Sequence, residues 1–269
     1  MYEKFFGLAE VPFKILPDAR FLWYSEQHKE AKEKIDFHIQ QKDGPVYLSA
    51  DVGLGKTTIA QRIKDELKAN KTKKVVYVFA PHLRSQNQFM RFIAGTEGFD
   101  IKTARSFQET LTNFEKYLLE QFEKGITQVL LIDEAQNLPY DALKTIHHLF
   151  NFSTPNQFLI QIALFGQPEL QKRIQSFPSL ASRMYPAKLR PFARKETEDM
   201  MQFRWTVAGG NTLPFEKDAL DEVHRLSRGV PRNICKLANE ALLHTMVARS
   251  NTVTKEFVAS AAKDAFEEA

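Results

Sequence analysis

The feature that most constrains the fold of this chain is a glycine-bearing loop between a short apolar run and an amphipathic helix. Residues 46–49 read VYLS, residues 50–57 read ADVGLGKT, and Ile59, Ile63 and Leu67 then recur four positions apart. A spacing of four places apolar side chains on one face of a helix. Glycines between a strand and a helix allow backbone N–H groups to turn toward an anion. The stretch therefore predicts a phosphate-binding loop.

The loop follows the pattern G-x-x-x-x-G-K-[ST], except that Ala50 stands at the first glycine. That position leaves the strand and need not direct an N–H at phosphate, so we expect a methyl group to be accommodated. Lys56 is expected to reach the β- and γ-phosphates, and the Thr57 hydroxyl to bind Mg²⁺. The simpler alternative is a glycine-containing turn with an exposed lysine. The predicted nucleotide-binding residues of the loop are Asp51, Val52, Gly53, Leu54, Gly55, Lys56, Thr57 and Thr58.

A second motif, VLLIDEAQ at residues 129–136, places two acids directly after an apolar run. Ligands of open α/β sheets bind outside the carboxyl ends of the strands, so we expect Asp133 and Glu134 to face Lys56. Asp133 would hold Mg²⁺, and Glu134 would activate the water that attacks the γ-phosphate. The alternative is that these acids only cap the N-terminus of a helix.

Further apolar runs at residues 75–79 and 158–165 predict more buried strands, and a stripe over 106–123 predicts a helix between them. This alternation predicts an α/β fold, a P-loop NTPase with a parallel sheet core. Only helical patterns follow Pro191, at residues 195–208, 215–227, 231–249 and 254–267. We expect a nucleotide-binding core with its N-terminal lead-in at residues 1–190, and an all-helical lid subdomain at 191–269.

Composition adds weaker constraints. The only cysteine, Cys235, cannot form an intrachain disulfide, and we expect it to be a packing residue. No apolar run approaches the length of a membrane span, and the N-terminus is not a secretory signal, so we expect a cytoplasmic protein without a membrane span. The net charge of +4 permits a nucleic-acid partner without requiring one.

Taken together, SADVGLGKTT, LLIDEAQNLP, LFGQPEL and SRGVPRNI resemble the AAA+ ATPases of the ExeA type. That family is related to transposition regulators of the TnsC and MuB kind. The N-terminal FFGLAEVPFKILPDARFLWYSEQHKEA is similar to the family's lead-in, and the resemblance extends from about residue 5 to residue 245. It implies ATP and Mg²⁺ as cofactors, and assembly of copies of the chain into a ring or a helical filament.

The resemblance also implies roles for single residues. Gln167 matches the sensor-1 polar residue near the γ-phosphate, although asparagine or threonine is more usual there. Arg232 in GVPR matches the sensor-2 arginine that links the lid to the nucleotide; a solvated arginine at a helix end is the alternative. Arg183 falls where an arginine finger would reach a neighbouring subunit, with Arg173 and Arg190 as competitors.

In the lead-in, the resemblance implies that Leu16, Pro17 and His28 lie beside the adenine. The aromatic residues Phe21 and Trp23 are expected to be core residues rather than base-stacking ones.

Two functions follow from the resemblance. In the first, ATP assembles the protein on duplex DNA without sequence specificity, and a transposase recognises the assembly; Arg84, Lys102 and Arg105 would contact DNA phosphates. In the alternative, the chain is an ATPase of a secretion or pilus-assembly system. We expect the first, because the secretion members carry a transmembrane helix beyond the ATPase core and this chain ends at Ala269. A third possibility, a nucleotide-gated protein-binding switch, is disfavoured by the intact Glu134.

Overall fold

A computed structural model describes residues 1–16, 18–79, 85–95 and 106–266. At its centre is one sheet with the strand order β2-β3-β4-β1-β5. Every neighbouring pair is parallel, as expected. The strands are β1 (Val46–Ser49), β2 (Lys73–Phe79), β3 (Thr127–Asp133), β4 (Ile160–Gly166) and β5 (Tyr185–Lys188). The parallel α/β core predicted from the sequence is therefore confirmed.

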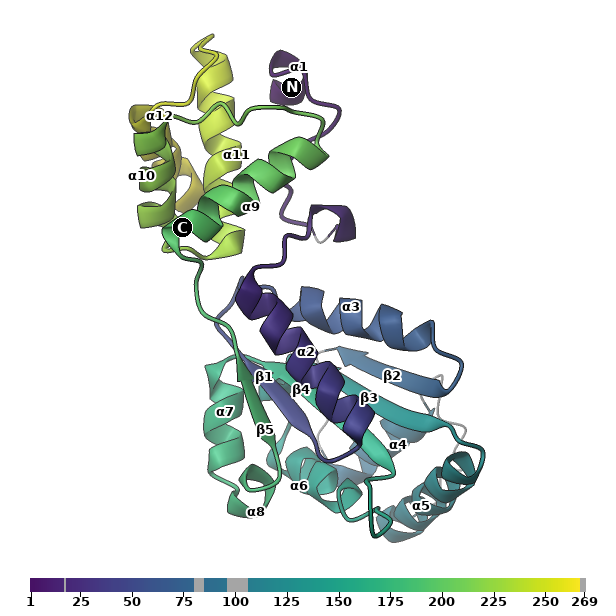
Figure 1. Cartoon of the computed structure of the whole chain (residues 1–269). Coiled ribbons are helices and arrows are strands. Elements are labelled where there is room, and N and C mark those ends of the chain that lie inside the picture. The colour runs from purple at the N-terminus through teal and green to yellow at the C-terminus, as the bar shows by residue number, and fades with distance from the viewer. Residues whose placement is uncertain (17, 80–84, 96–105, 267–269) are drawn as a thin grey trace. The chain divides into compact units, whose positions relative to one another are not determined.

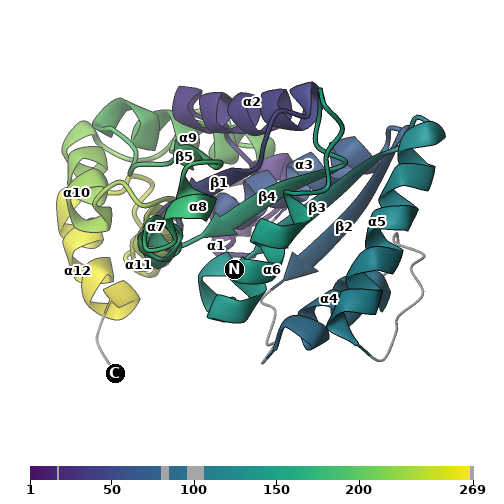
Figure 2. The same cartoon turned by 90° about the horizontal axis from the view of Figure 1, so that it is seen from below.

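Helices cover both faces of the sheet (Figure 2). One face carries α2 (Glu26–Gln41) and α3 (Lys56–Lys68), and the other carries α4 (Gln86–Gly95), α5 (Phe107–Glu123) and α6 (Tyr140–Leu149). The short segments η2 (Ala135–Asn137), α7 (Pro168–Gln175) and α8 (Pro178–Ala181) follow β3 and β4. Because both faces are covered, every residue of β3 and β4 is buried, which explains their unbroken apolar runs.

The stripe expected on the helix over residues 106–123 consists of Phe107, Leu111, Phe114, Leu118 and Phe122, and the structure departs from it only at its end. Leu111, Phe114 and Leu118 are buried in the core of the sheet. Phe122, however, is 39% exposed, and Gln121 is buried in its place. The helix begins where expected, because the Ser106 hydroxyl accepts a hydrogen bond from the backbone N–H of Glu109.

The chain divides into two compact units. The sheet unit comprises residues 28–52 and 59–189, and the helical unit comprises residues 1–27, 53–58 and 190–269. The helical unit contains α1 (Tyr2–Phe5), η1 (Ala19–Phe21), α9 (Arg194–Val207), α10 (Lys217–Ser227), α11 (Pro231–Val247) and α12 (Lys255–Phe266), shown in Figure 1. This grouping departs from the expected one, because the lead-in belongs with the C-terminal helices and not with the sheet.

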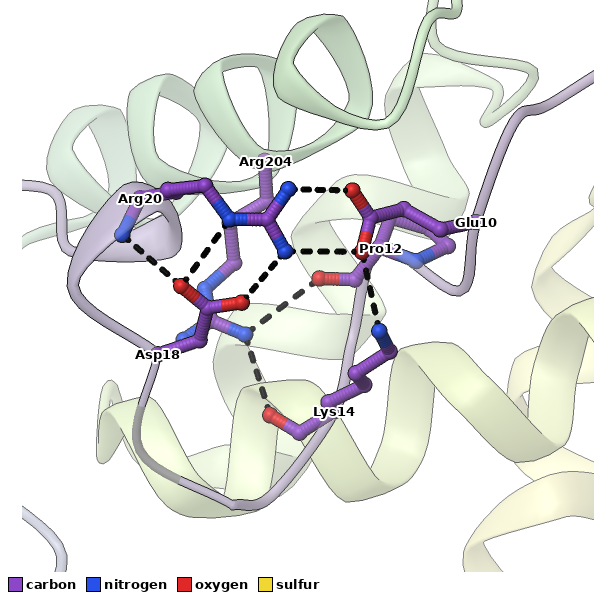
Figure 3. A network of polar contacts seen from close by, with 6 residues as sticks. All are labelled: Glu10, Pro12, Lys14, Asp18, Arg20 and Arg204. Carbon is purple, nitrogen blue, oxygen red and sulfur yellow. Dashed lines mark hydrogen bonds and ion pairs between the residues drawn. The ribbon is translucent and has the colours of Figure 1, made fainter.

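Direct contacts explain why the lead-in joins the helical unit. The Tyr2 hydroxyl donates a hydrogen bond of 2.6 Å to Oδ1 of Asn239 in α11. The guanidinium of Arg204 in α9 donates to the backbone oxygens of Pro12 and Lys14, at 3.3 and 3.1 Å (Figure 3). The lead-in side chains Tyr2, Leu8, Phe13 and Phe21 lie in the same hydrophobic core as the four C-terminal helices.

A network of charged side chains closes the lead-in on itself (Figure 3). The Arg20 guanidinium pairs with the carboxylates of Glu10 and Asp18 at 2.7 and 2.6 Å, and Lys14 pairs with Glu10 at 2.9 Å. The hydrogen bonds from Arg20 lower the pKa of both carboxyl groups. The Arg20 side chain is 60% exposed, so solvent screens these pairs and we assign them little stability.

Among the described residues, no helix combines the length and the apolar character needed to cross a membrane.

Candidate functional site

The carboxyl end of β3 carries the predicted metal ligand. Asp133 is the last residue of β3 and is fully buried. Its Oδ2 accepts a hydrogen bond of 3.0 Å from the Tyr77 hydroxyl, and its Oδ1 accepts the backbone N–H of Glu134 at 2.9 Å. Burial and the adjacent Asp133 raise the pKa of Tyr77, so the phenol stays protonated and remains a donor.

Glu134 follows in the left-handed region, with φ 53° and ψ 36°. This conformation is uncommon for a residue with a side chain and clusters at functional sites. The Glu134 side chain makes no capping hydrogen bond to the short helix η2 that it precedes. Its Oε2 instead accepts the Gln136 amide at 2.6 Å and, more weakly, the Gln167 amide at 3.5 Å. The helix-cap alternative therefore does not describe this carboxylate.

Gln136 connects the ends of β3 and β4. Its Oε1 accepts the backbone N–H of Gln167 at 3.1 Å, and its backbone oxygen accepts a hydrogen bond from Arg173. Gly166 makes this contact possible, because a Cβ there would lie 2.9 Å from Oε1 of Gln136 and 2.9 Å from Cβ of Leu170. Gln136 and Gly166 lie in LIDEAQ and GQPEL, but neither motif alone predicts their contact. The available signal was a glycine that directly follows an apolar strand.

The start of the glycine loop lies at the carboxyl-terminal ends of the same strands. Strands β1, β4 and β3 are consecutive parallel neighbours, so their carboxyl ends lie together. The backbone N–H of Ala50 donates to the oxygen of Gly166 at 3.1 Å, and the Ser49 hydroxyl lies 3.4 Å from the oxygen of Gln167. Ala50 is buried, so its methyl group is accommodated as expected. Asp51 and Val52 are exposed.

The rest of the loop, residues 53–58, belongs to the helical unit. Gly53 and Gly55 have φ values of 86° and 93°, which side chains rarely tolerate. Consecutive residues near such turns form concave sets of N–H groups that bind anions. Lys56 is the first residue of α3, and Thr57 and Thr58 lie in its first turn. This backbone is what a phosphate-binding loop requires.

Thr57 and Asp133 each carry an oxygen of the chemical kind that Mg²⁺ prefers. This ion usually takes one or two protein oxygens together with phosphates and waters, rather than a cage made only of protein ligands. The hydroxyl of Thr57 and the carboxylate of Asp133 are oxygen ligands of that kind. Within the described ranges, no group of three or more His, Cys, Asp or Glu side chains could hold a metal by itself.

Gly53 packs against the start of α11 within the helical unit. The backbone N–H of Arg232 lies 3.4 Å from the oxygen of Gly53. A Cβ at Gly53 would lie 2.9 Å from Cβ of Arg232 and 3.0 Å from Cγ1 of Val230. Gly229 is also sterically required, since a Cβ there would lie 2.2 Å from the oxygen of Phe192. The GVPR motif therefore places Arg232 on the first turn of α11, directly against the glycine loop.

The three candidate arginine fingers differ in their surroundings. Arg173 donates to the backbone oxygen of Gln136 and is thus used inside the chain. Arg183 is exposed and donates to Oδ1 of Asn151 at 3.1 Å, and Arg190 is also exposed. The assignment of the finger to Arg183 stays a prediction, with Arg190 as the remaining competitor.

Other predicted residues have mixed outcomes. Phe21 is a core residue, as expected, and Trp23 packs edge-on against Phe192 at 5.3 Å. Cys235 is buried and burial raises the pKa of its thiol, in agreement with a packing role. Leu16 is 80% exposed. His28 lies in the first turns of α2. Pro17 and the three predicted DNA-contacting residues, Arg84, Lys102 and Arg105, lie outside the described residues.

Comparison with known proteins identifies the family of this chain. The family model described as AAA domain matches residues 39–174, half of the chain. The General secretion pathway protein A of Aeromonas hydrophila is 31% identical over 265 residues, which cover 97% of this chain and 48% of the relative. The chain thus spans about half the length of that relative. The identity over nearly the whole of this chain supports the resemblance to the ExeA type.

Solved structures share the fold at low sequence identity. Cdc6p from Pyrobaculum aerophilum has a TM-score of 0.68 at 18% identity, covering 94% of this chain and 72% of that one. The Orc1 protein of Aeropyrum pernix, solved in complex with DNA, has a TM-score of 0.65 at 18% identity, covering 94% and 69%. Sheet order, loop backbone and sequence all agree, and the chain belongs to the AAA domain family of P-loop NTPases.

Proposed function

We propose that the chain binds ATP with Mg²⁺ and hydrolyses it, and that this reaction controls the assembly of several copies. One observation carries the proposal. A carboxylate, Glu134, lies at the end of a buried strand and is hydrogen-bonded to two glutamine amides, beside the point where the glycine loop leaves β1. Family membership implies nucleotide hydrolysis and supports the same conclusion.

The residues divide the chemistry among them. Lys56 and the amides around Gly53 and Gly55 bind the phosphates, and Arg232 adds a cation from α11. Thr57 and Asp133 would hold Mg²⁺, which when bound offsets the charge on the phosphate oxygens.

Different residues take up the proton of the attacking water and make the contact with a neighbouring subunit. Glu134 orients the attacking water and accepts its proton, and Gln167 donates a hydrogen bond near the reacting oxygens. Arg183 of one subunit would complete the site of a neighbour, which couples hydrolysis to assembly.

Turnover of a Glu134→Gln variant tests the proposal. We expect wild-type protein to release phosphate from ATP, and the variant to bind a fluorescent ATP analogue normally but to turn over about 10²–10⁴-fold more slowly. The control is Glu169→Gln, an exposed acid in the first turn of α7, which should keep the wild-type rate. Normal turnover in Glu134→Gln would remove the role given to the end of β3.

For the biological process, we favour a secretion system. The supporting observation is the identity with General secretion pathway protein A over nearly the whole of this chain. This reverses the order of the two functions expected from the sequence. The position at which this sequence ends gives no reason to prefer the DNA role, because the chain spans only about half the length of that relative.

Assembly on duplex DNA with a transposase partner remains the second candidate. It is supported by the fold shared with Orc1, a protein solved in complex with DNA, and by the net charge of +4. Phosphate contacts by Arg84, Lys102 and Arg105 would make binding insensitive to sequence and sensitive to salt.

Sedimentation with ATP separates the two candidates. Assembly that requires duplex DNA and weakens steeply between about 50 and 200 mM salt would select the DNA role. Assembly that is indifferent to DNA would select the secretion role. In either case Arg183→Ala should leave nucleotide binding intact and lower turnover of the assembled protein, whereas unchanged turnover at high protein concentration would reassign the finger.

A further inference from the structure

We propose that Gln136 is a positioning residue for hydrolysis, whose amide fixes the Glu134 carboxylate to the segment that carries Gln167. This inference rests on the proposed function, because it concerns how the same site works. It also assigns a role to the last residue of DEAQ, which the sequence pattern alone does not distinguish.

The Gln136 side chain makes two hydrogen bonds of opposite kind. Its Nε2 donates to Oε2 of Glu134 at 2.6 Å, and its Oε1 accepts the backbone N–H of Gln167 at 3.1 Å. A primary amide is suited to this because one end group carries both donors and an acceptor. Glutamate at position 136 would have no donor for Glu134, and methionine would keep the length of the side chain but have neither polar group.

Neighbouring residues hold Gln136 itself in place. Arg173, from α7, donates to its backbone oxygen, and the short helix η2 fixes the backbone around it. The missing Cβ of Gly166 leaves the space that Oε1 occupies. The amide is therefore located by contacts from β4 and α7 as well as by its own turn, and it can transmit that location to Glu134.

The contact matters because a glutamate side chain has several rotatable bonds. A general base works only when its oxygen lies within hydrogen-bond reach of the water that it deprotonates. The bond from Gln136 engages one carboxylate oxygen, Oε2, and a carboxylate has a second oxygen with which to accept the proton. Loss of about 1 Å of positional accuracy in such a group reduces rates by about 10²-fold.

A double-mutant cycle on the full chain tests this role. In Gln136→Met we expect kcat for ATP to fall about 10- to 100-fold while KM stays within about threefold of wild type. In a Glu134→Ala background, single-turnover hydrolysis should change by less than about twofold on adding Gln136→Met, because no carboxylate remains to be positioned. The matched control is Asn137→Ala, an exposed neighbour in η2, with an expected kcat close to wild type.

Each outcome decides the matter. An unchanged or higher kcat in Gln136→Met, or an equal loss in both backgrounds, would overturn the positioning role, since a structural defect would act in both. Gln136→Glu repeats the test with a polar residue of the same size if the methionine variant does not fold, and it should also lose kcat. If wild-type protein releases no phosphate, the proposed function fails. If it does and both Gln136 variants match it, only this inference fails.

Discussion

The two units of the molecule use polar side chains in different ways. In the sheet unit, a connected series of hydrogen bonds lies at the carboxyl ends of β3 and β4. It joins Asp133, Glu134, Gln136 and Gln167. In the helical unit, polar contacts such as Tyr2–Asn239 join the two ends of the chain. The comparison teaches that the polar contacts of the sheet unit join the ends of two neighbouring strands, whereas those of the helical unit join residues more than 200 positions apart.

The largest expected effect is on nucleotide binding. Lys56→Ala should weaken ATP binding by about 100-fold, because charge-assisted hydrogen bonds to phosphate are worth about 1.5–3 kcal/mol. Titration with a fluorescent ATP analogue measures this, and Lys68→Ala in the last turn of α3 is the control. Unchanged affinity in Lys56→Ala would mean that the loop, which belongs to the helical unit, does not bind the phosphates.

The next largest effect is expected from a bulkier residue at Gly166, the last residue of β4. Gly166→Ala would place a methyl group within 2.9 Å of Gln136 and Leu170, and overpacking of this kind costs about 1–3 kcal/mol. We expect lower thermal stability together with a large loss of turnover, since the new methyl displaces the amide next to Glu134. Full stability and activity in Gly166→Ala would show that the end of β4 can shift easily and does not hold Gln136 in place.

A smaller effect tests the packing of the lead-in. Tyr2→Phe removes one hydroxyl and its 2.6 Å hydrogen bond to Asn239, and we expect a loss of about 1 kcal/mol in the free energy of unfolding. Denaturant unfolding measures it, with Tyr140→Phe as the control, because Tyr140 is 51% exposed on α6. Equal effects from the two substitutions would contradict a specific attachment of the lead-in to α11.

The smallest effect is expected from the exposed charges of Figure 3. Arg20→Ala should lower the melting temperature less than Tyr2→Phe does, and about 1 M salt should abolish the difference from wild type. Arg20 lowers the pKa of Glu10 and Asp18, so its contribution is present above their unfolded pKa values. It is lost as the pH falls through their folded values. An effect that grows on acidification would contradict this assignment.

The sequence predicts the elements that bury apolar side chains. Strands β1 to β4 appear as unbroken apolar runs because both faces of the sheet are covered. Helices α9 to α12 appear as apolar stripes because each buries one face. The sequence does not predict β5, because this strand is four residues long, contains Pro186 and has three exposed positions. A strand at the edge of a sheet tolerates proline and carries little apolar signal.

The site was predicted in part for the same reason. Motifs identify Asp133 and Glu134, because the chemistry requires those residue types directly after a strand. The link from Glu134 through Gln136 to Gln167 depends on two strands lying side by side and on the empty space at Gly166, which no local pattern reports. The grouping of the lead-in with α11 was missed likewise, as it arises from contacts between distant segments.

The chain passes between its two units at four points: between residues 27 and 28, 52 and 53, 58 and 59, and 189 and 190. Modular dissection is consequently the wrong approach to this protein. A fragment that starts at Pro191 would lack Tyr2, Phe13 and Phe21 from its own hydrophobic core, and a fragment that ends there would leave those side chains without their packing partners. Tags and fusion partners should therefore be added to the full chain and not to a fragment cut near Pro191.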